Sequence, residues 1–413
     1  MNTLECHHYQ SDRCRSCQWI EKDLAHQIIE KENHLIQLLK TTPFYDNDYP
    51  SLLQETQSGP ISEFRNKAKM VALGGAHNPS LGIENHHGKI VSLVDCPLYT
   101  PDMQELLLGI QEWIQVAGIP PYRKDKQKGE LKYVLVTQNR QNEFMVRLVL
   151  RSLDIQKRIE ERLPLLEEKF PKIKVLTINI QSEHKAIIEG HQEIILSDKN
   201  YLVESLNDIP LAMTPGGFFQ TNSHLAETLY KTASLWAYST VEQMNNQCHL
   251  DKNNGEINIW DLFCGVGGFG ISISQYFKKQ LLNPILTGIE ISPEAIHAAT
   301  TTANKIHLKN ISFQAMDSQD YTSNKTFVKK YEKSNSPHIM IVNPPRRGIS
   351  QSVCEFIESS QVLSIIYSSC EAKTLASDLC MMPSFEIKKI QIFDLFPHTA
   401  HYETLCLLQR KSS

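Results

Sequence analysis

The chain has 413 residues, of which 41% are hydrophobic and 21% are charged, and its formal net charge is −4. This length allows two or three domains, and the charge balance excludes a uniformly basic surface, so any nucleic-acid-binding face must be a local patch. The chain has no run of about eighteen apolar residues, which a membrane helix needs, and no signal peptide is evident. We therefore expect a cytoplasmic protein, in which cysteine clusters indicate metal binding or catalysis rather than disulfides.

Three cysteines lie close together near the N-terminus. Seven residues separate Cys6 from Cys14, and two separate Cys14 from Cys17. A two-residue spacer lets both thiolates of a pair reach one ion or cluster. The best candidate for a fourth ligand is Cys96, because a proline follows it, as is common beside iron–sulfur ligands. The spacing favours a metal site over an unrelated redox pair, and it leaves zinc and iron–sulfur both open.

The middle of the chain predicts a small α/β domain. Strand-like runs span residues 131–137, 144–151, 175–181 and 193–196, and helical stretches span residues 103–117 and 156–169. Cations gather beside an aromatic residue in two places, around Phe64 and between Tyr122 and Lys132. These patches fit either a nucleic-acid-facing sheet or a solvated charged face, and composition alone does not decide between them.

The last two hundred residues predict a cofactor domain. Strand-like runs at residues 259–263, 285–290, 311–316, 339–343 and 364–369 alternate with helical segments, which predicts a parallel sheet. Residues 385–393 and 402–408 are joined by too few residues for a parallel crossover, so they form an antiparallel hairpin. Five parallel strands closed by such a hairpin are typical of Rossmann-like, class I methyltransferases that use S-adenosylmethionine.

Several candidate cofactor residues follow these strands. Gly265 lies in a glycine-rich turn after the first strand, where the backbone can approach a ligand closely. The second strand ends at Glu290, whose carboxylate can accept hydrogen bonds from both ribose hydroxyls of the cofactor. Asp317 follows the third strand and can meet the adenine, although a turn or helix-capping role fits equally well. Asn343 opens an Asn-Pro-Pro turn, and Arg346, rather than an aromatic residue, follows it, which argues against an exocyclic amine as the target.

Cys370 and Glu403 are the candidate catalytic pair. Taken alone, Cys370 would be interpreted as a small buried hydrophobic residue. However, it follows the fifth strand, and Glu403 begins the antiparallel strand, so both belong at the edge of the sheet where the parallel strands end. A thiolate that adds to C6 of uracil makes C5 nucleophilic, and a base must then remove the C5 proton. Either Asn343 or Gln220 could bind the uracil edge.

Five motifs together resemble the RNA uracil-C5 methyltransferases. They lie at residues 218–222, 261–268, 343–348, 368–370 and 398–403. Within this family, the resemblance is strongest to the branch that modifies 23S ribosomal RNA at a position of the uracil-747 type. It covers nearly the whole chain. Two departures are Gly216-Gly217 before the first motif and Glu371 after Cys370; an unpaired Glu371 carboxylate would raise the pKa of the Cys370 thiol.

The resemblance implies specific ligands and roles. It implies that Cys370 is the nucleophile, that Glu403 is the base, and that Gln220 and Asn343 serve the cofactor more than the uracil. It also implies S-adenosylmethionine contacts from Phe263 and Glu290, and a [4Fe-4S] cluster on Cys6, Cys14, Cys17 and Cys96.

The expected organisation has three parts. These are a cysteine segment followed by a helix (1–57), a central RNA-facing α/β domain that supplies Cys96 (58–205) and a catalytic domain (206–413), with no room before Cys6 for an RNA-binding OB-type barrel. The expected partner is 23S ribosomal RNA, and no obligatory protein partner is evident. The alternatives are the same chemistry on another ribosomal or transfer RNA uridine, and a non-catalytic iron–sulfur RNA-binding protein.

Overall fold

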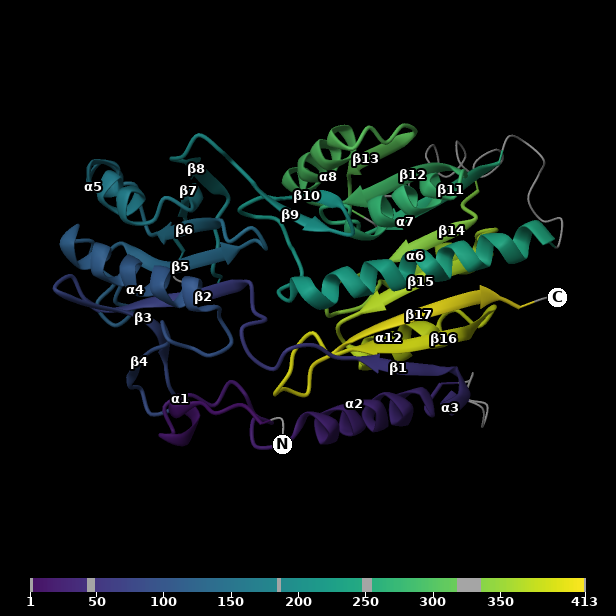
Figure 1. The fold of residues 1–413 in the computed structure, drawn as a ribbon, viewed down its shortest axis with the longest axis horizontal. Helices are drawn as coiled ribbons and strands as arrows, with labels where there is room; N and C mark the ends of the chain where they lie inside the picture. Colours follow the sequence, from purple (N-terminus) through teal and green to yellow (C-terminus); the bar gives the residue numbers. More distant parts are fainter. Residues whose placement is uncertain (1–2, 43–48, 184–186, 247–254, 318–335, 412–413) are drawn as a thin grey trace.

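The computed structural model describes residues 3–42, 49–183, 187–246, 255–317 and 336–411. Two large sheets lie beside each other along the long axis of the molecule (Figure 1). The smaller sheet comes from the middle of the sequence and the larger one mainly from its C-terminal part. Within the described residues, no helix is long and apolar enough to cross a membrane.

The larger sheet contains the predicted parallel strands and the predicted hairpin. The parallel strands are β11 (Glu256–Leu262), β12 (Asn283–Glu290), β13 (Ile311–Ala315), β14 (Ile339–Val342) and β15 (Ser364–Ser369). The hairpin consists of β16 (Phe385–Phe393) and β17 (Glu403–Arg410), and β17 runs antiparallel between β15 and β16. With β1 (Leu53–Gln57) at one edge, the strand order is β1-β16-β17-β15-β14-β11-β12-β13. The predicted arrangement of five parallel strands closed by an antiparallel hairpin is therefore confirmed.

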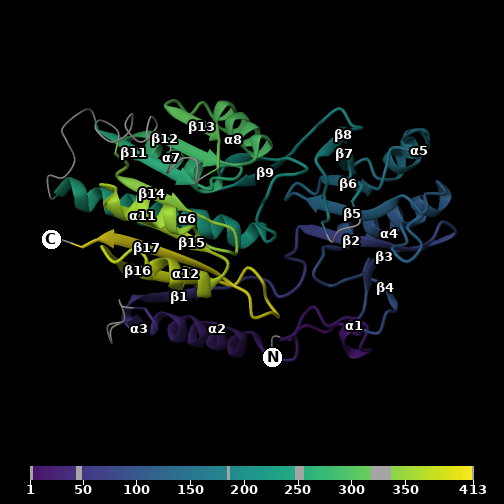
Figure 2. The same ribbon diagram turned by 180° about the vertical axis from the view of Figure 1, so that it is seen from behind.

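Helices cover both faces of this sheet because its strands are apolar on both sides. Ile259 and Ile341 point to one hydrophobic cluster, whereas Trp260 and Val342 belong to another on the opposite face. The first cluster includes residues of α6 (Ser223–Asn246), α7 (Gly268–Lys279) and α8 (Pro293–Lys305). The second includes residues of α2 (Leu24–Leu39), α11 (Gln351–Ser359) and α12 (Ala372–Cys380), which can be followed in Figure 2.

The N-terminal segment extends along the larger sheet and reaches the smaller one. The short strand β1 (Leu53–Gln57), which follows α3 (Tyr49–Leu52), pairs in parallel with β16 at the edge of the larger sheet. Helix α2 packs against α12, and the single-turn helix α1 (His7–Gln10) lies near β4 (Ile90–Ser92) of the smaller sheet (Figure 1). The helix is expected from the sequence, whereas this strand is not, and the described residues of the segment pack onto both parts of the molecule.

The central part of the chain forms a seven-stranded sheet covered by two helices. Its strands are β2 (Lys67–Gly75), β3 (Asn78–Glu84), β4 (Ile90–Ser92), β5 (Leu131–Gln138), β6 (Phe144–Leu150), β7 (Ile173–Ile180) and β8 (Gln192–Ile195), in the order β4-β3-β2-β5-β6-β7-β8. Helices α4 (Pro101–Val116) and α5 (Gln156–Lys169) contribute to a shared hydrophobic core with the sheet. The four predicted strands and two predicted helices are confirmed, and residues 67–92 add three more strands.

A two-stranded hairpin lies where the sequence analysis placed a domain boundary. Strands β9 (Leu202–Leu206) and β10 (Ile209–Met213) pair in antiparallel fashion, so a boundary between residues 205 and 206 falls within β9. Their apolar side chains pack in the same hydrophobic cluster as α6 and α7. The expected boundary therefore lies inside a hairpin that shares a hydrophobic cluster with α6 and α7.

Candidate active site

The larger sheet brings Cys370 and Glu403 together, although 33 positions separate them in the sequence. Cys370 directly follows β15, and Glu403 is the first residue of β17. These strands are antiparallel neighbours, with Ser369 opposite Thr404. The Ser368 hydroxyl donates a hydrogen bond to Oε1 of Glu403, whose side chain is buried. The thiol and the carboxylate thus lie at one edge of the sheet, as the sequence topology predicts.

Burial controls the charge of both groups. It raises the pKa of Glu403 from 4.5 to about 7, although the Ser368 hydrogen bond acts in the opposite direction. Burial, and next the Glu403 carboxylate, raise the pKa of the Cys370 thiol from 9.0 to about 11. The Arg346 guanidinium opposes this increase, while Glu371 adds the smallest contribution to it. Arg346 is thus a cation that favours the reactive thiolate, a role that the sequence analysis did not assign to it.

The turn after β11 has the geometry of a ligand-binding loop. Phe263 adopts a left-handed backbone conformation with φ +63°, which is uncommon for a non-glycine residue and often marks a functional site. Gly265 has φ +53°, and a Cβ added there would meet no atom within 4 Å, so this part of the loop is open. The Gly265 N–H donates to Oε2 of Glu290 over 3.2 Å, and the Ser292 N–H donates to Oε1 over 3.0 Å.

A buried acid supports the same loop from below. Oδ2 of Asp261 accepts a hydrogen bond of 2.9 Å from the Gly270 N–H, at the start of α7. Its Oδ1 is buried without a hydrogen-bond partner. Burial raises the pKa of Asp261 from 3.8 to about 8, so the side chain is largely protonated at neutral pH and can itself donate a hydrogen bond. An unsatisfied polar atom beside an open loop fits a site built to hold a polar ligand.

The other candidate cofactor residues lie at the ends of adjacent strands. Asn343 follows β14, and its N–H approaches the Leu262 carbonyl of β11 at 3.4 Å. The Met316 N–H donates to the Glu290 carbonyl, which places Asp317 just beyond the end of β13. Gln220 comes from the segment before α6 and is buried. The structure thus gathers Phe263, Gly265, Glu290, Asp317 and Asn343 along one edge of the sheet.

Residues 63–66 connect the Cys96 loop to the segment that contains Gln220. The N–H groups of Glu63 and Arg65 donate to the carbonyls of Pro97 and Leu98 over 3.0 and 2.9 Å. The Asn66 N–H donates to the Thr221 carbonyl over 2.9 Å, and its side-chain amide donates to the Gln220 carbonyl over 3.0 Å. Part of the segment interpreted from sequence as a basic patch is therefore a structural link between two candidate sites.

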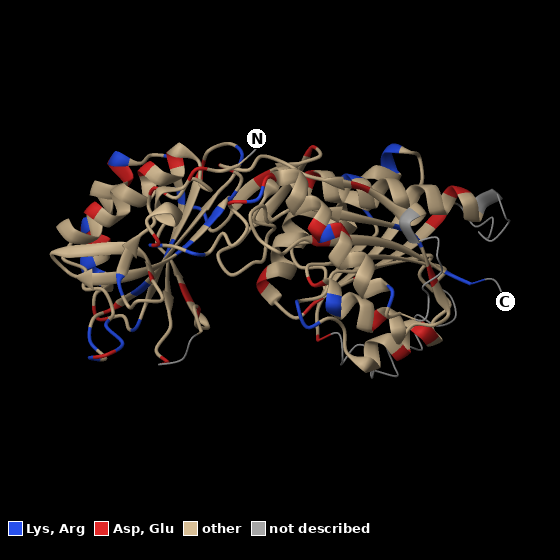
Figure 3. Cartoon of the chain, turned by 90° about the horizontal axis from the view of Figure 1, so that it is seen from below, with Lys and Arg blue, Asp and Glu red and all other residues tan. Residues whose placement is uncertain are grey.

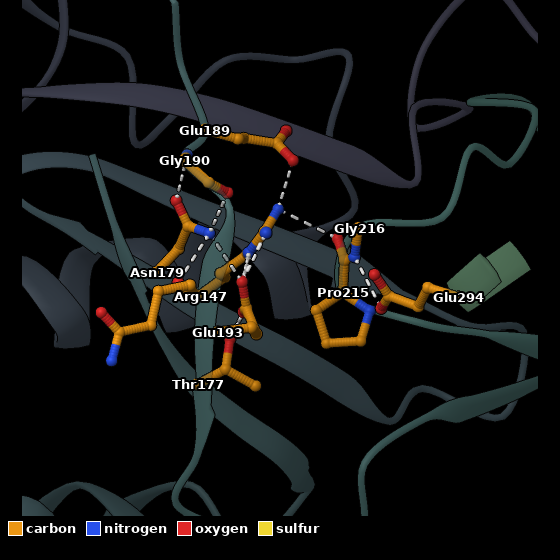
Figure 4. Close-up of polar contacts among 10 residues, drawn as sticks. Arg147, Thr177, Asn179, Glu189, Gly190, Glu193, Pro215, Gly216 and Glu294 are labelled. Atoms are coloured by element: carbon orange, nitrogen blue, oxygen red, sulfur yellow. Dashed lines mark hydrogen bonds and ion pairs between the residues drawn. The ribbon is translucent and has the colours of Figure 1, made fainter. Parts of the chain in front are cut away.

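Arg147 forms a second link between the central sheet and the catalytic part (Figure 4). Its buried guanidinium is held by Glu189 and Glu193 and donates to the Pro215 carbonyl over 3.1 Å. The next residue, Gly216, donates its N–H to Oε1 of Glu294 on α8 over 3.2 Å. This network fixes the backbone that leads to Gln220. The sequence offers no periodic signal for it, because its members come from four separate segments.

Lys132 differs from the prediction that it contributes to an exposed basic patch. Only 7% of the residue is exposed. Its ammonium donates to Oε1 of Gln181 and to the Glu183 carbonyl, and it lies 4.9 Å from the centre of the Tyr122 ring. The prediction for Lys132 is therefore wrong, because buried polar partners hold its charge. Figure 3 shows acidic and basic segments interspersed in both halves of the molecule, so any RNA-binding patch is local.

The four cysteines predicted to bind a metal lie within electrostatic range of one another. Burial, followed by interactions with Cys96, Cys14 and Cys6, raises the pKa of the Cys17 thiol to about 12. Burial also raises the pKa of Cys96 to about 11, and Cys6 and Cys14 contribute to this increase. The structure thus brings Cys96 to the N-terminal cysteines, and four such thiolates need a cationic centre to be stable together.

Comparisons with known proteins identify the family of the chain. Residues 141–411 match the family model described as tRNA (uracil-5-)-methyltransferase. A Shewanella protein (strain MR-4) named 23S rRNA (uracil(747)-C(5))-methyltransferase RlmC is 45% identical over 410 residues, covering 99% of each chain. A protein of the same name from Glaesserella parasuis is 42% identical over 417 residues, covering 100% of each chain. The chain belongs to the RNA uracil-C5 methyltransferase family.

Membership of the uracil-C5 methyltransferase family confirms the resemblance identified from the motifs, and it makes the chain an S-adenosylmethionine-dependent methyltransferase. The crystal structure of Pyrococcus abyssi tRNA (uracil-54, C5)-methyltransferase in complex with S-adenosyl-L-homocysteine superposes with a TM-score of 0.72. That alignment covers 95% of this chain and 85% of the other, with 21% sequence identity. The predicted class I methyltransferase fold is therefore confirmed.

Proposed function

We propose that this enzyme methylates C5 of a uridine at a 747-type position of 23S ribosomal RNA, and that it acts in the cytoplasm, where this RNA is found. The proposal rests on the full-length similarity to enzymes named for that reaction. The main structural support is that the Cys370 thiol lies close to the buried Glu403 carboxylate. Both groups are at the edge of the sheet where Gly265 also lies. A non-catalytic RNA-binding protein would have no need for this arrangement.

In the proposed mechanism, the Cys370 thiolate forms a bond to C6 of uracil. The electron pair of the C5–C6 double bond shifts toward C5 and O4, so that C5 becomes nucleophilic. S-adenosylmethionine would supply the methyl group from its sulfonium sulfur: C5 would bond to the methyl carbon, and the electron pair of the broken S–CH3 bond would stay on the sulfur of S-adenosylhomocysteine. The Glu403 carboxylate then accepts the C5 proton, the C5–H electron pair restores the C5–C6 double bond, and the C6–S electrons return to Cys370 as a thiolate.

The residues around the β11 turn suit the proposed cofactor. Glu290 would accept hydrogen bonds from the ribose hydroxyls, and Phe263, Gly265 and Asn343 would contact the cofactor along the same edge of the sheet. Gln220 and Asp317 complete the proposed set. Support comes from the open side of Gly265 and from the unsatisfied Oδ1 of Asp261 at the base of the loop. The central domain would face the RNA.

The proposed RNA target can be tested in cells. We expect 5-methyluridine at the 747-type position to disappear from 23S ribosomal RNA when the gene is deleted, and to return with the wild-type gene but not with Cys370→Ala. Mass-spectrometric mapping of ribosomal and transfer RNA measures this directly. If the deletion instead removes 5-methyluridine from a different ribosomal or transfer RNA site, the proposed reaction stands but its target is that other site. An unchanged pattern of 5-methyluridine would contradict the proposed function.

We also propose that Cys6, Cys14, Cys17 and Cys96 hold a [4Fe-4S] cluster. When bound, such a cluster would join the N-terminal segment covalently to the Cys96 loop through metal–thiolate bonds. We expect anaerobically purified protein to be brown and to contain about four iron atoms per chain. Metal analysis and visible absorption measure this, and a Cys17→Ser variant should lose both the iron and the colour. One equivalent of zinc without iron would contradict the assignment.

A further inference from the structure

Nine residues connect β16 to Glu403, and this connection, residues 394–402, lies at the active-site edge of the larger sheet. The N-terminal segment holds it at several points. The Asp394 N–H donates to the Gln57 carbonyl of β1 over 2.8 Å. The Tyr402 hydroxyl, one residue before Glu403, is 2.8 Å from Nδ1 of His34 on α2. Both ends of the connection are thus attached to residues that precede the central domain.

A fully buried ion pair lies inside this contact. Nζ of Lys31 on α2 is 2.6 Å from Oδ1 of Asp394 and donates to the Phe396 carbonyl over 3.3 Å. The Lys31 and Asp394 side chains are both 0% exposed. Buried ion pairs contribute little net stability, because desolvation offsets their attraction, but they can specify one geometry. The geometry specified here is that of the connection where it leaves β16.

His398, in the middle of the connection, is fully buried and is held through both its backbone and its side chain. Its backbone is left-handed, with φ +66°. Its N–H donates to Oε1 of Gln27 over 2.6 Å, its carbonyl accepts from the Trp19 N–H over 2.9 Å, and its Nε2 is 2.7 Å from the Ile61 carbonyl. The Gln27 amide also donates to the Trp19 carbonyl over 3.2 Å, which ties this contact to the chain two residues after Cys17.

We propose that Gln27 and Lys31 are positioning residues for the catalytic base: the N-terminal segment holds the 394–402 connection so that the Glu403 carboxylate can reach the C5 proton. This inference rests on the proposed function of Glu403. Neither residue touches the reacting atoms. Because proton removal needs the carboxylate within hydrogen-bond distance of C5–H, a small displacement of this connection slows elimination more than it slows methyl transfer.

The test follows the fate of the covalent protein–RNA intermediate. Gln27→Leu removes the acceptor for the His398 N–H while keeping a similar volume on a helix. A Lys31→Met, Asp394→Leu double variant replaces the ion pair with apolar groups, a change that often preserves stability. Purified full-length enzymes react with 23S ribosomal RNA fragments and methyl-labelled S-adenosylmethionine, and denaturing gels separate adduct from free product. Gln37→Leu, at an exposed position of the same helix, is the matched control.

We expect both test variants to form methyl-labelled adduct at a near-normal rate and to release product about tenfold or more slowly, a partial loss of the roughly 10²–10⁴-fold that general-base catalysis contributes. The control should behave like wild type. Wild-type release by both test variants would overturn the inference, as would adduct and product falling together, which indicates general loss of structure. Glu403→Gln is run in parallel: if it accumulates adduct while the test variants do not, only the positioning role fails. If it shows none, the assignment of the base itself fails.

Discussion

Replacing Cys370 with alanine should abolish methylation while leaving cofactor binding nearly unchanged. Without the thiolate, C5 of uracil is too weak a nucleophile to accept the methyl group, so we expect a loss on the order of 10⁴-fold or more. The cofactor residues lie on other strands and should be unaffected. Transfer of labelled methyl groups to 23S ribosomal RNA and calorimetric binding of S-adenosylhomocysteine measure the two properties separately.

Cys380 provides the control for this experiment. It is an exposed free cysteine at the end of α12, one helix after the nucleophile. Cys380→Ala should retain wild-type activity. Measurable turnover by Cys370→Ala would remove Cys370 as the nucleophile, whereas equal losses in both variants would indicate a general sensitivity of this region.

Replacing Glu403 with glutamine should trap the covalent RNA intermediate. Methyl transfer precedes proton removal, so the variant should form the methylated adduct and then release product about 10²–10⁴-fold more slowly. The amide keeps the shape of the carboxylate and can still bond to Ser368. An RNA-dependent band on denaturing gels that carries the methyl label measures the adduct. Normal product formation without such a band would remove Glu403 as the base.

The raised pKa of Glu403 predicts a pH dependence with a definite sign. Because only the carboxylate can accept the C5 proton, elimination by the wild type should accelerate as the pH rises through about 7. Between the ordinary value of 4.5 and about 7, the folded state binds more protons than the unfolded state, so stability should fall as the pH rises. Denaturant unfolding at pH 5 and pH 8 should therefore show a smaller loss for Glu403→Gln than for wild type.

Much of the catalytic sheet could be predicted because its local signals are strong. The strands β11, β14 and β15 are short apolar runs that end in glycine, Asn-Pro-Pro or small polar residues. Such runs predict buried parallel strands, and the short connection before Tyr402 predicts a hairpin. Once the strand directions are known, the positions of Cys370 and Glu403 follow, and the structure confirms them.

The electrostatic surroundings of these residues could not be predicted. The contribution of Arg346 to the thiol depends on how the turn after β14 folds over the end of β15. Likewise, Lys132 lies in a run of basic residues, which predicts an exposed side chain. In the structure it is buried, and the carbonyl and amide groups that accept its hydrogen bonds belong to residues about fifty positions later. A sequence pattern reports periodicity along the chain, but burial of a charged side chain depends on partners that are distant in sequence.

The sequence by itself determined the family, the class of fold, the candidate nucleophile and base, and the four cysteines that could share a metal site, because each depends on motifs or on strand direction. Only the tertiary structure decided how the N-terminal segment is used. Strand β1 is short and polar, and Gln27 and Lys31 are polar residues on an otherwise ordinary helix. Their contacts with residues 394–398 span more than three hundred positions, and no local preference encodes such a contact. It exists because folding buries these polar groups together, and each then needs a partner.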